Sequence, residues 1–343
     1  MKKSVLLIYT GGTIGMIENA ETGALENFDF DQLLRHVPEL RRFHYRIASY
    51  QFDPPIDSSD MSPELWAKIV RIISYNYDFY DGFVILHGTD TMAYTASALS
   101  FMLENLTKPV ILTGSQLPIG TLRTDGKENL ITAIEIATAK NPDGTPTVPE
   151  VCILFENELL RGNRATKANA EYFNAFRSYN FPPLAHVGIH IRYDHHLIHR
   201  PDPSGTLHPH FTMDNNVVVL TLFPGIKEEI IHSVFSTTEL KAVVLKTFGA
   251  GNAPQRPWLI REIEDATRRG VAVVNITQCQ RGFVEMDRYG TGLQLQEAGV
   301  ICGYDSTPEA AVTKLMFLLG HGLDLRRIRY YMNTSIAGEI TKE

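Results

Sequence analysis

Cysteine is scarce in this chain of 343 residues, occurring only at positions 152, 279 and 302. The three lie far apart and form no Cys-x-x-Cys pair, so neither a disulfide framework nor a cysteine-rich metal site is indicated. Cys152 and Cys302 stand in apolar, strand-like contexts (VCILF and VICGY), where we expect buried free thiols. A sparse and odd number of cysteines is typical of a protein kept in a reducing compartment.

Long apolar runs and blocks of one charge are also missing. No stretch approaches the ~20 apolar residues of a membrane span. Lys2-Lys3 and the run Val5–Tyr9 resemble the start of a secretory signal, but Gly11-Gly12 follows after about five apolar residues and a signal core needs about 7–15. The net charge is −7, from 32 Lys and Arg against 39 Asp and Glu, and no basic cluster stands out to attract nucleic-acid phosphates. We expect a cytoplasmic protein with neither a membrane nor a nucleic-acid partner.

Apolar runs alternate with amphipathic segments along the first half of the chain. The runs at 5–9, 83–86, 110–112 and 151–155 are expected to be strands buried on both faces. Ser62-Pro63-Glu64 predicts the start of a helix, and 91–103 and 126–139 are further helical segments. This alternation predicts an α/β fold, with a mostly parallel sheet and helices on both of its faces.

The composition changes after about residue 191. Residues 193–215 carry prolines, a glycine and five histidines without a sustained period, which predicts an interdomain linker. Strand patterns then restart at 217–222, 242–245 and 271–276, with helices from Lys227, over 258–269 and finally from Thr307 to Gly320. The predicted organisation is a larger N-terminal domain (1–192), the linker (193–215) and a smaller α/β C-terminal domain (216–343).

Glycine and hydroxyl residues follow three of the predicted strands. The segments are Thr10-Gly11-Gly12-Thr13, His87-Gly88-Thr89-Asp90-Thr91 and Thr113-Gly114-Ser115-Gln116. Ligands of open α/β sheets bind outside the carboxyl ends of the strands, and glycine lets the backbone approach a ligand closely. A binding site is therefore expected there, although a tight turn at Gly11-Gly12 and capping of the next helix by Asp90-Thr91 are alternatives.

A cationic segment, Arg161-Gly162-Asn163-Arg164-Ala165-Thr166-Lys167, follows the 151–155 run. A lone lysine in such a loop is normally solvated. Lys167 gains a chemical role only as a partner of Asp90, because a hydroxyl nucleophile needs a nearby base or charge pair.

Together these segments resemble the bacterial type I L-asparaginase family. The matching motifs are TGGTIG (10–15), DSSDM (57–61), HGTDTMAYTASALSFML (87–103), TGSQLP (113–118), RGNRATKAN (161–169), GAGNAPQ (249–255) and NITQC (275–279). They occur in the family's order over almost the whole chain. The resemblance implies hydrolysis of L-asparagine to L-aspartate and ammonia through a threonine nucleophile and a β-aspartyl-enzyme, with no metal and no organic cofactor.

The resemblance also implies catalytic roles for four residues, all in the predicted N-terminal catalytic domain. Thr13 matches the nucleophile of the family. Thr89 matches a second threonine, which works with Asp90 and Lys167 as a buried triad. Asp90 is also implied to hold the ammonium group of the substrate.

Further positions follow from the same resemblance. Ser58 and Ser59 match residues that bind the α-carboxylate and α-amino group of the substrate. Asn252 matches an asparagine that approaches the active site of the neighbouring subunit, in a homotetramer built from two intimate dimers. Ala24 stands where the family often has a tyrosine packed over the nucleophile, which leaves the closure over Thr13 undefined.

Type I enzymes can also bind asparagine at a second, allosteric site. Thr166 and Cys279 fit that pattern, and Lys246 stands where the family has an arginine. Lysine is a point charge and cannot replace the bidentate fork of a guanidinium.

Other functions stay open from the sequence alone. A glutaminase-asparaginase of broad specificity is one, because an extra methylene is worth only ~1–3 kcal/mol of discrimination in a pocket. The tRNA-dependent amidotransferase subunit that resembles asparaginase is a second. A non-catalytic amino-acid sensor is a third, but a sensor would not require Thr13, Thr89, Asp90 and Lys167 together. A dinucleotide-binding protein is disfavoured, since TGGTIG lacks the glycine spacing.

Overall fold

The structure, a computed structural model of the chain, describes residues 2–18, 25–27, 36–202, 205–287 and 290–342. The chain divides into two compact units, 1–211 and 212–343, and each is described by itself. Ala24, and with it the question of what closes over Thr13, lies outside the described residues.

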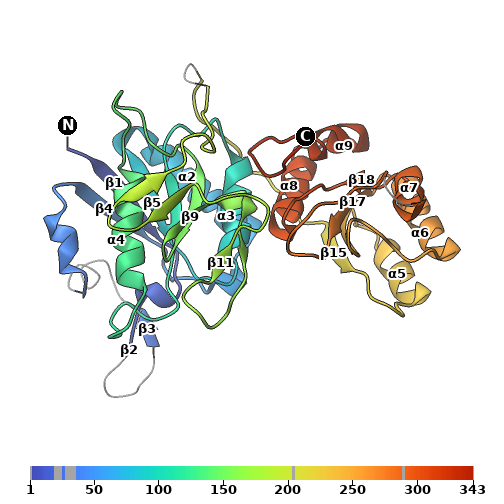
Figure 1. The fold of residues 1–343 in the computed structure, drawn as a ribbon, viewed down its shortest axis with the longest axis horizontal. Helices are drawn as coiled ribbons and strands as arrows, with labels where there is room; N and C mark the ends of the chain where they lie inside the picture. Colours follow the sequence, from blue (N-terminus) through green and yellow to red (C-terminus); the bar gives the residue numbers. More distant parts are fainter. Residues whose placement is uncertain (1, 19–24, 28–35, 203–204, 288–289, 343) are drawn as a thin grey trace. The chain divides into compact units, whose positions relative to one another are not determined.

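An eight-stranded sheet forms the centre of the first unit, in the order β13-β12-β9-β8-β7-β5-β1-β4 (Figure 1). The strands are β1 Ser4–Tyr9, β4 Arg46–Gln51, β5 Gly82–Leu86, β7 Val110–Thr113, β8 Val151–Phe155, β9 Glu158–Arg161, β12 Ala185–Val187 and β13 Ile191–Tyr193. Neighbours from β4 to β8 run parallel, and β9, β12 and β13 continue the sheet antiparallel. The prediction of a mostly parallel α/β sheet is confirmed. The sequence did not indicate β4, β9, β12 and β13, because these short or polar strands lack a continuous apolar run.

Helices cover both faces of this sheet. They are α2 Pro63–Asn76, α3 Met92–Met102 and α4 Gly126–Ala137. Leu130 and Ile134 of α4 share one buried cluster with Leu7 and Val84 of the strands. The intervening strand residues, such as the buried Ile85, point to the opposite face, where α3 contacts β7 and β8 and packs against α2.

Several short elements complete the first unit. They are η1 Thr13–Gly15, β2 Met16–Glu18, β3 Leu25–Asn27, η2 Pro38–Arg42, η3 Ser58–Asp60, η4 Tyr77–Phe79, β6 Leu103–Glu104, η5 Gly162–Arg164, β10 Thr166–Lys167, β11 Phe176–Arg177 and β14 His208–Pro209. Strand β14 pairs with β6, so much of the predicted linker 193–215 belongs to the first unit. Ile198 is buried there, and the carbonyl of Leu197 accepts a 2.7 Å hydrogen bond from Arg161.

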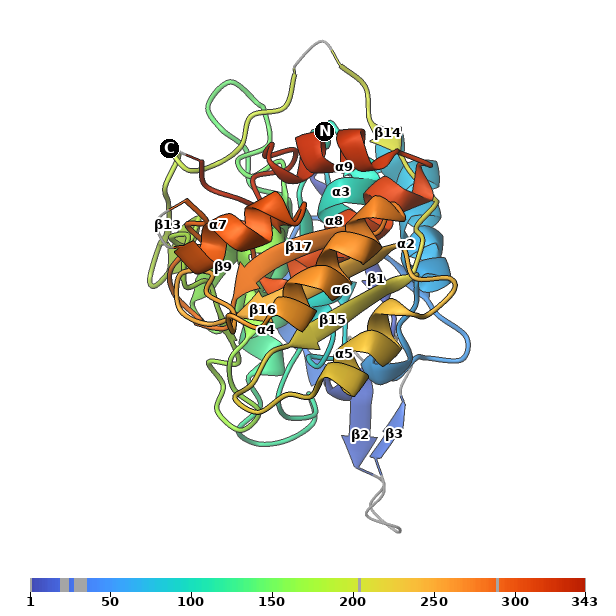
Figure 2. The same ribbon diagram turned by 90° about the vertical axis from the view of Figure 1, so that its right-hand side faces the viewer.

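Four parallel strands form the sheet of the second unit, in the order β15-β16-β17-β18 (Figure 2). The elements are β15 Val217–Thr221, α5 Glu228–Phe235, β16 Ala242–Thr247, α6 Pro257–Arg268, β17 Ala272–Thr277, α7 Gly290–Glu297, β18 Ile301–Cys302, α8 Pro308–Gly320 and α9 Leu325–Met332. Phe235, Ile263 and Leu295 bring α5, α6 and α7 into one core cluster. Leu315 and Ile328 bring α8 and α9 into the other, so this sheet is also covered on both faces.

The sequence did not predict α7 and α9, and the expectation that the helix ending at Gly320 is the last one is wrong. Helix α9 has the sequence LRRIRYYM, and only Ile328 and Met332 of it are buried. Leu325, Ile328 and Met332 share the core-facing side of the helix, but a segment of eight residues is shorter than the window over which a helical period can be recognised. The side chain of Asp324 accepts a hydrogen bond from Arg327 N and caps the helix start.

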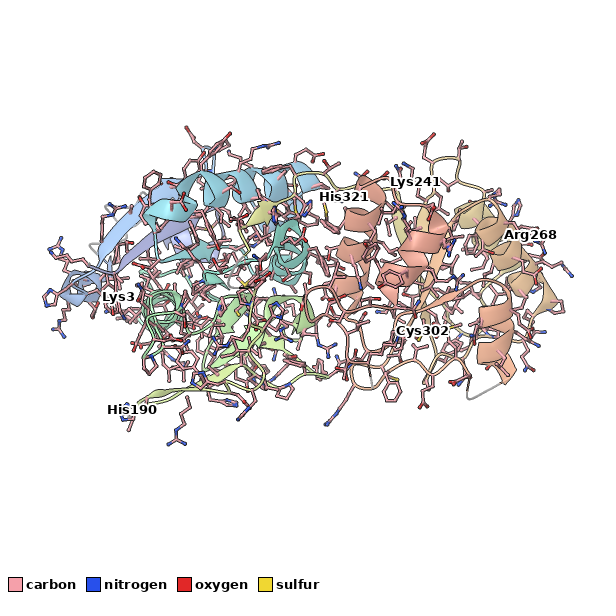
Figure 3. The ribbon with its side chains drawn as sticks, turned by 90° about the horizontal axis from the view of Figure 1, so that it is seen from above. Lys3, His190, Lys241, Arg268, Cys302 and His321 are labelled. Atoms are coloured by element: carbon pink, nitrogen blue, oxygen red, sulfur yellow. The ribbon has the colours of Figure 1, made fainter. Side chains whose placement is uncertain are left out.

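The three cysteines are free thiols. Cys152 on β8 is buried, as expected, and burial raises the pKa of its thiol. Cys302 on β18 is partly buried, with its Sγ 3.4 Å from the carbonyl oxygen of Val284 (Figure 3). Cys279 is exposed.

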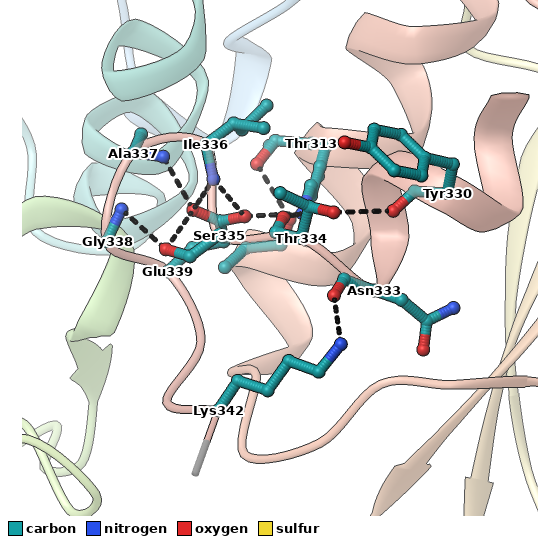
Figure 4. Close-up of polar contacts among 12 residues, drawn as sticks. Thr313, Tyr330, Asn333, Thr334, Ser335, Ile336, Ala337, Gly338, Glu339 and Lys342 are labelled. Atoms are coloured by element: carbon teal, nitrogen blue, oxygen red, sulfur yellow. Dashed lines mark hydrogen bonds and ion pairs between the residues drawn. The ribbon is translucent and has the colours of Figure 1, made fainter.

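A buried ion pair between Lys314 and Glu339 connects α8 to the C-terminal segment, residues 334–342 (Figure 4). Lys314 Nζ contacts a carboxylate oxygen of Glu339 and donates to the carbonyl of Thr334 at 2.7 Å. The carboxylate also accepts from the backbone N–H groups of Ile336 at 3.1 Å and Ala337 at 2.8 Å. The two side chains are 1% and 0% exposed. Burial lowers the pKa of Lys314, and the charge of Glu339 opposes that shift.

Candidate active site

Three loops meet at the carboxyl edge of the first sheet. Strand β1 lies between β4 and β5 and runs parallel to both, so the three strands end side by side. A Cβ placed on Gly11 would lie 2.0 Å from Ile56 O, and one on Gly12 would lie 2.5 Å from Gly88 N. A Cβ on Gly88 would lie 2.5 Å from Ser58 Oγ. The backbones of the loops after β1, β4 and β5 are therefore in direct contact, and only glycine permits this approach.

Thr13 stands in the first of these loops. Gly12 has φ 93°, in the region that favours glycine, and Thr13 then starts the short turn η1. The side chain of Ile14 is buried and Thr13 is partly exposed. Tyr9 donates its hydroxyl to the carbonyl of Gly15 at 3.1 Å and fixes the end of the turn.

Thr89, Asp90 and Lys167 come together at the next strand end. Lys167 Nζ donates to Thr89 Oγ1 at 2.8 Å and to Asp90 Oδ1 at 2.6 Å. Thr89 follows β5, whereas Lys167 comes from β10, which lies against α3. The structure thus brings Lys167 into contact with two neighbouring side chains that lie 78 and 77 residues earlier in the sequence.

The expected burial of this triad is only partly correct. Thr89 is 9% exposed, and the side chains of Lys167 and Asp90 are 19% and 64% exposed. Asp90 therefore keeps most of its side chain exposed while its Oδ1 contacts Lys167 Nζ. A carboxylate in this position remains accessible to a cationic ligand.

Asp90 and Thr91 were alternatively expected only to cap α3, but their side chains bond residues of other loops instead. Thr91 occupies the N-cap position, but its side chain makes no capping hydrogen bond. It donates instead to the carbonyl of Ser58 at 2.7 Å. Both side chains therefore connect α3 to neighbouring loops.

Ser58 and Ser59 lie in the loop after β4. They start the turn η3, and the carboxylate of Asp57 accepts a 2.8 Å hydrogen bond from Ser59 N. Ser58 is buried beside Gly88, whereas Ser59 is exposed. The loop thus offers two hydroxyl groups next to the turn that carries Thr89.

Gln116 is a further residue of this site, and sequence reasoning gave it no role. Thr89 Oγ1 donates to Gln116 Oε1 at 3.3 Å, and Gln116 Nε2 donates to the carbonyl of Tyr172 at 3.2 Å. Its backbone N–H donates to the carboxylate of Asp125 at 3.0 Å. Burial raises the pKa of the Asp125 carboxyl, although the hydrogen bonds that it accepts from the backbone N–H groups of Gln116 and Leu117 act in the opposite direction. The available signal was the position of Gln116 three residues after the end of the buried strand β7.

The other predicted residues lie elsewhere. Asn252 stands in a tight turn after β16, and its Oδ1 accepts a 2.6 Å hydrogen bond from Thr291 Oγ1. Lys246 is on β16 and Cys279 follows β17, both in the second unit, whereas Thr166 is on β10 of the first. The roles predicted for these four residues stay predictions.

Within the described ranges, no group of three or more His, Cys, Asp or Glu side chains could hold a metal ion. None of the helices described there has the length and apolar character of a membrane span.

The two α/β units of the chain match two domain families that define one class of amidohydrolases. Residues 4–199 match the family described as "Asparaginase, N-terminal", and residues 216–332 match the "Glutaminase/Asparaginase C-terminal domain". The chain belongs to the asparaginase family.

Several similar proteins are L-asparaginases, two of them of type I by name. L-asparaginase 1 of Escherichia coli strain K12 is 47% identical over 346 residues, which cover 100% of this chain and 99% of that protein. The crystal structure of L-asparaginase I from Vibrio cholerae O1 biovar eltor has a TM-score of 0.90 at 44% identity and covers 100% of both chains. The thermostable L-asparaginase from Thermococcus kodakarensis has a TM-score of 0.89 at 37% identity, over 99% of this chain and 100% of that one. The likeness to type I L-asparaginases predicted from the motifs is confirmed.

Proposed function

We propose that this enzyme hydrolyses L-asparagine to L-aspartate and ammonia, with Thr13 as the nucleophile and Thr89, Lys167 and Asp90 as the groups that move the proton. The contact of Lys167 Nζ with both Thr89 Oγ1 and Asp90 Oδ1 supports this proposal most directly. The close approach of the Gly12 and Gly88 backbones, which brings the loop of Thr13 to the loop of Thr89, supports it as well.

Asparagine offers a carboxylate and an ammonium group a short distance from its side-chain amide. Ser58 and Ser59 supply hydroxyl donors for the carboxylate, and the exposed Asp90 supplies a negative charge for the ammonium. A primary amide is a poor electrophile, so the reaction needs an activated hydroxyl and donors for the developing oxyanion. Glycine-rich loops leave backbone N–H groups free for the second task.

The proton must leave a hydroxyl group and reach the departing nitrogen. Attack by Thr13 Oγ1 on the amide carbon gives a tetrahedral intermediate, and cleavage of the C–N bond releases ammonia and leaves a β-aspartyl ester. Water then attacks this ester, releases aspartate and restores the threonine. In the proposed relay, the hydroxyl proton of Thr13 passes through Thr89 and Lys167 to the departing nitrogen, which then leaves as ammonia, and Asp90 stabilises the positive charge on Lys167 as the proton passes.

The resting geometry shows the opposite direction of donation. Lys167 donates to Thr89 Oγ1, which in turn donates to Gln116 Oε1. Gln116 therefore accepts the hydroxyl proton of Thr89 in this state, and the proposed relay requires Thr89 to turn this proton toward Lys167. No metal or organic cofactor has a step in this mechanism.

Finer properties of the family extend the proposal. We propose a cytoplasmic homotetramer, built as a dimer of dimers, in which Asn252 approaches the active site of a neighbouring subunit. Thr166, Lys246 and Cys279 form a proposed allosteric asparagine site. A sigmoidal dependence of rate on asparagine concentration, lost in Lys246→Ala, is expected, and a hyperbolic curve over a wide range of concentrations would remove the allosteric site from the proposal.

Glutamine hydrolysis is the second candidate function, because the family of the second domain includes glutaminases by its description. We expect ammonia release from L-asparagine with a kcat/KM about 10–200-fold above that for L-glutamine, the range that one methylene provides in a pocket. The measurement is coupled ammonia detection with both amides at the same enzyme concentration.

Three other outcomes would change the account. Equal kcat/KM values for the two amides would indicate a glutaminase-asparaginase. Calorimetric binding of asparagine without ammonia release would indicate a sensor. Neither binding nor release would contradict the proposed function altogether.

A further inference from the structure

A chain of three buried side chains lies beneath the turn that carries Thr89. Trp66 of α2 donates its indole Nε1–H to Thr95 Oγ1 of α3 at 3.0 Å. Thr95 Oγ1 lies 2.9 Å from His87 Nε2, and His87 Nδ1 lies 2.7 Å from the carbonyl oxygen of Gly88. The exposed fractions of Trp66, Thr95 and His87 are 6%, 0% and 1%.

The direction of donation along this chain follows from the chemistry of its two ends. The carbonyl oxygen of Gly88 can only accept, so His87 carries a proton on Nδ1 and donates it there. In a neutral ring Nε2 is then unprotonated and accepts the hydroxyl proton of Thr95. The indole N–H of Trp66 can only donate, so Thr95 Oγ1 accepts that bond.

The charge state of the ring agrees with this assignment. Burial lowers the pKa of His87 to about 4, against which the hydrogen bond to Gly88 acts only partly. The imidazole is neutral at neutral pH, so one ring nitrogen remains an acceptor.

The carbonyl that His87 holds belongs to the peptide that joins Gly88 to Thr89. This unit is planar, so fixing its oxygen fixes the plane from which the Thr89 backbone departs. Gly88 has no side chain to hold it, and its N atom lies against the backbone of Gly12. The direction of the Gly88–Thr89 peptide in turn decides whether Thr89 Oγ1 reaches Lys167 Nζ, which lies 2.8 Å away.

We propose that His87 is a positioning residue, held in its Nδ1–H tautomer by Thr95 and Trp66, that aims Thr89 at Lys167 through the carbonyl of Gly88. This role rests on the proposed function, since Thr89 matters only if it takes part in the hydrolysis. His87 itself touches neither the substrate nor the reacting atoms.

Thr95→Val tests this role because it keeps the side-chain shape and removes the proton that His87 Nε2 accepts in this tautomer. We expect kcat for asparagine to fall by about 10²-fold, the cost of a misplaced reacting group, with KM changed less than about threefold because the substrate contacts stay. Thr95→Ser keeps the hydroxyl and is expected to restore most of kcat. Thr138→Val is the matched control, since Thr138 is also almost fully buried, at 1% exposed, and its hydroxyl donates to the carbonyls of Ile134 and Glu135 in α4.

A spectroscopic measurement tests the tautomer without reference to activity. Nitrogen NMR of the histidine-labelled protein is expected to show His87 neutral, with Nδ1 protonated at pH 7, and Thr95→Val and Trp66→Phe are expected to change that signature. Thermal unfolding of each variant separates loss of fold from loss of positioning.

The outcomes separate this role from the proposed function. An Nε2–H or charged His87 in the wild type would overturn the positioning role, and so would a folded Thr95→Val enzyme with unchanged kcat. Absence of any amide turnover in the wild type would instead overturn the proposed function, and the positioning role with it.

Discussion

Replacing Lys167 with methionine is expected to lower kcat/KM for asparagine by about 10²–10⁴-fold, the range that a positioned acid–base group contributes. Methionine preserves the length of the side chain but cannot donate to Thr89 Oγ1 or Asp90 Oδ1, which lie 2.8 and 2.6 Å from Lys167 Nζ. The effect should appear in kcat more than in KM, because the proton transfer is needed in the transition state.

Lys167→Arg distinguishes a role of Lys167 in proton transfer from a role as a fixed positive charge. A guanidinium keeps the positive charge but is not deprotonated in proteins, so a relay through Lys167 predicts that this variant is also strongly impaired. Steady-state kinetics with asparagine measures both variants. An active Lys167→Arg enzyme would show that Lys167 acts as a fixed charge.

Lys140→Met is the matched control for both variants. Lys140 pairs with Asp81 at 2.8 Å, and the two side chains are 39% and 25% exposed. Asp81 precedes β5, at the end of the strand opposite Thr89. An exposed pair of this kind is worth ~0–1 kcal/mol, so activity should stay close to that of the wild type. Equal losses in Lys140→Met and Lys167→Met would remove the relay from the account.

Glu339→Leu is expected to lower the free energy of unfolding of the second unit by about 3–5 kcal/mol, the cost of removing one member of a buried ion pair. The substitution leaves the ammonium of Lys314 without its counter-ion in a site where both side chains are almost fully buried. It also leaves the backbone N–H groups of Ile336 and Ala337 without their acceptor. Urea unfolding followed by circular dichroism measures the change.

The double variant Lys314→Met/Glu339→Leu tests the physical reason for that loss. It removes both charges at once, so part of the stability should return relative to Glu339→Leu. The surface control is Lys241→Met, because Lys241 pairs with Asp214 in the same unit with side chains 48% and 16% exposed. If Glu339→Leu cost no more than Lys241→Met, the buried pair would not fasten the C-terminal segment.

Sequence reasoning located the parts of the fold whose signal is local. The apolar runs of β1, β5, β7 and β8 mark buried parallel strands, and proline at the first turn marks the starts of α2 and α8. It did not locate β9 and α9, because these depend on neighbours that are distant in sequence. The segment 193–215 was predicted to be a linker, yet its residues up to Phe211 belong to the first unit, where they contact Arg161 and β6.

Some residues of the candidate site could likewise be predicted from the sequence, and others could not. Thr89 and Asp90 could be predicted from a hydroxyl and a carboxylate at a strand end, and Lys167 only by asking what could pair with them. Gln116 and His87 could not be given roles from the sequence, because their hydrogen bonds to Thr89 Oγ1 and Gly88 O exist only in the folded chain. The exposure of Asp90 is likewise a property of the assembled loops.

The proposed hydrolysis and its two threonines are tested together by ammonia release from L-asparagine, measured side by side for the wild type, Thr13→Ala and Thr89→Val. We expect release by the wild type and a loss of about 10²-fold or more in each variant, since nucleophile and proton relay act as a unit. Thr13→Ala and Thr89→Val enzymes that both kept full activity, or a folded wild type that released no ammonia, would contradict the proposal.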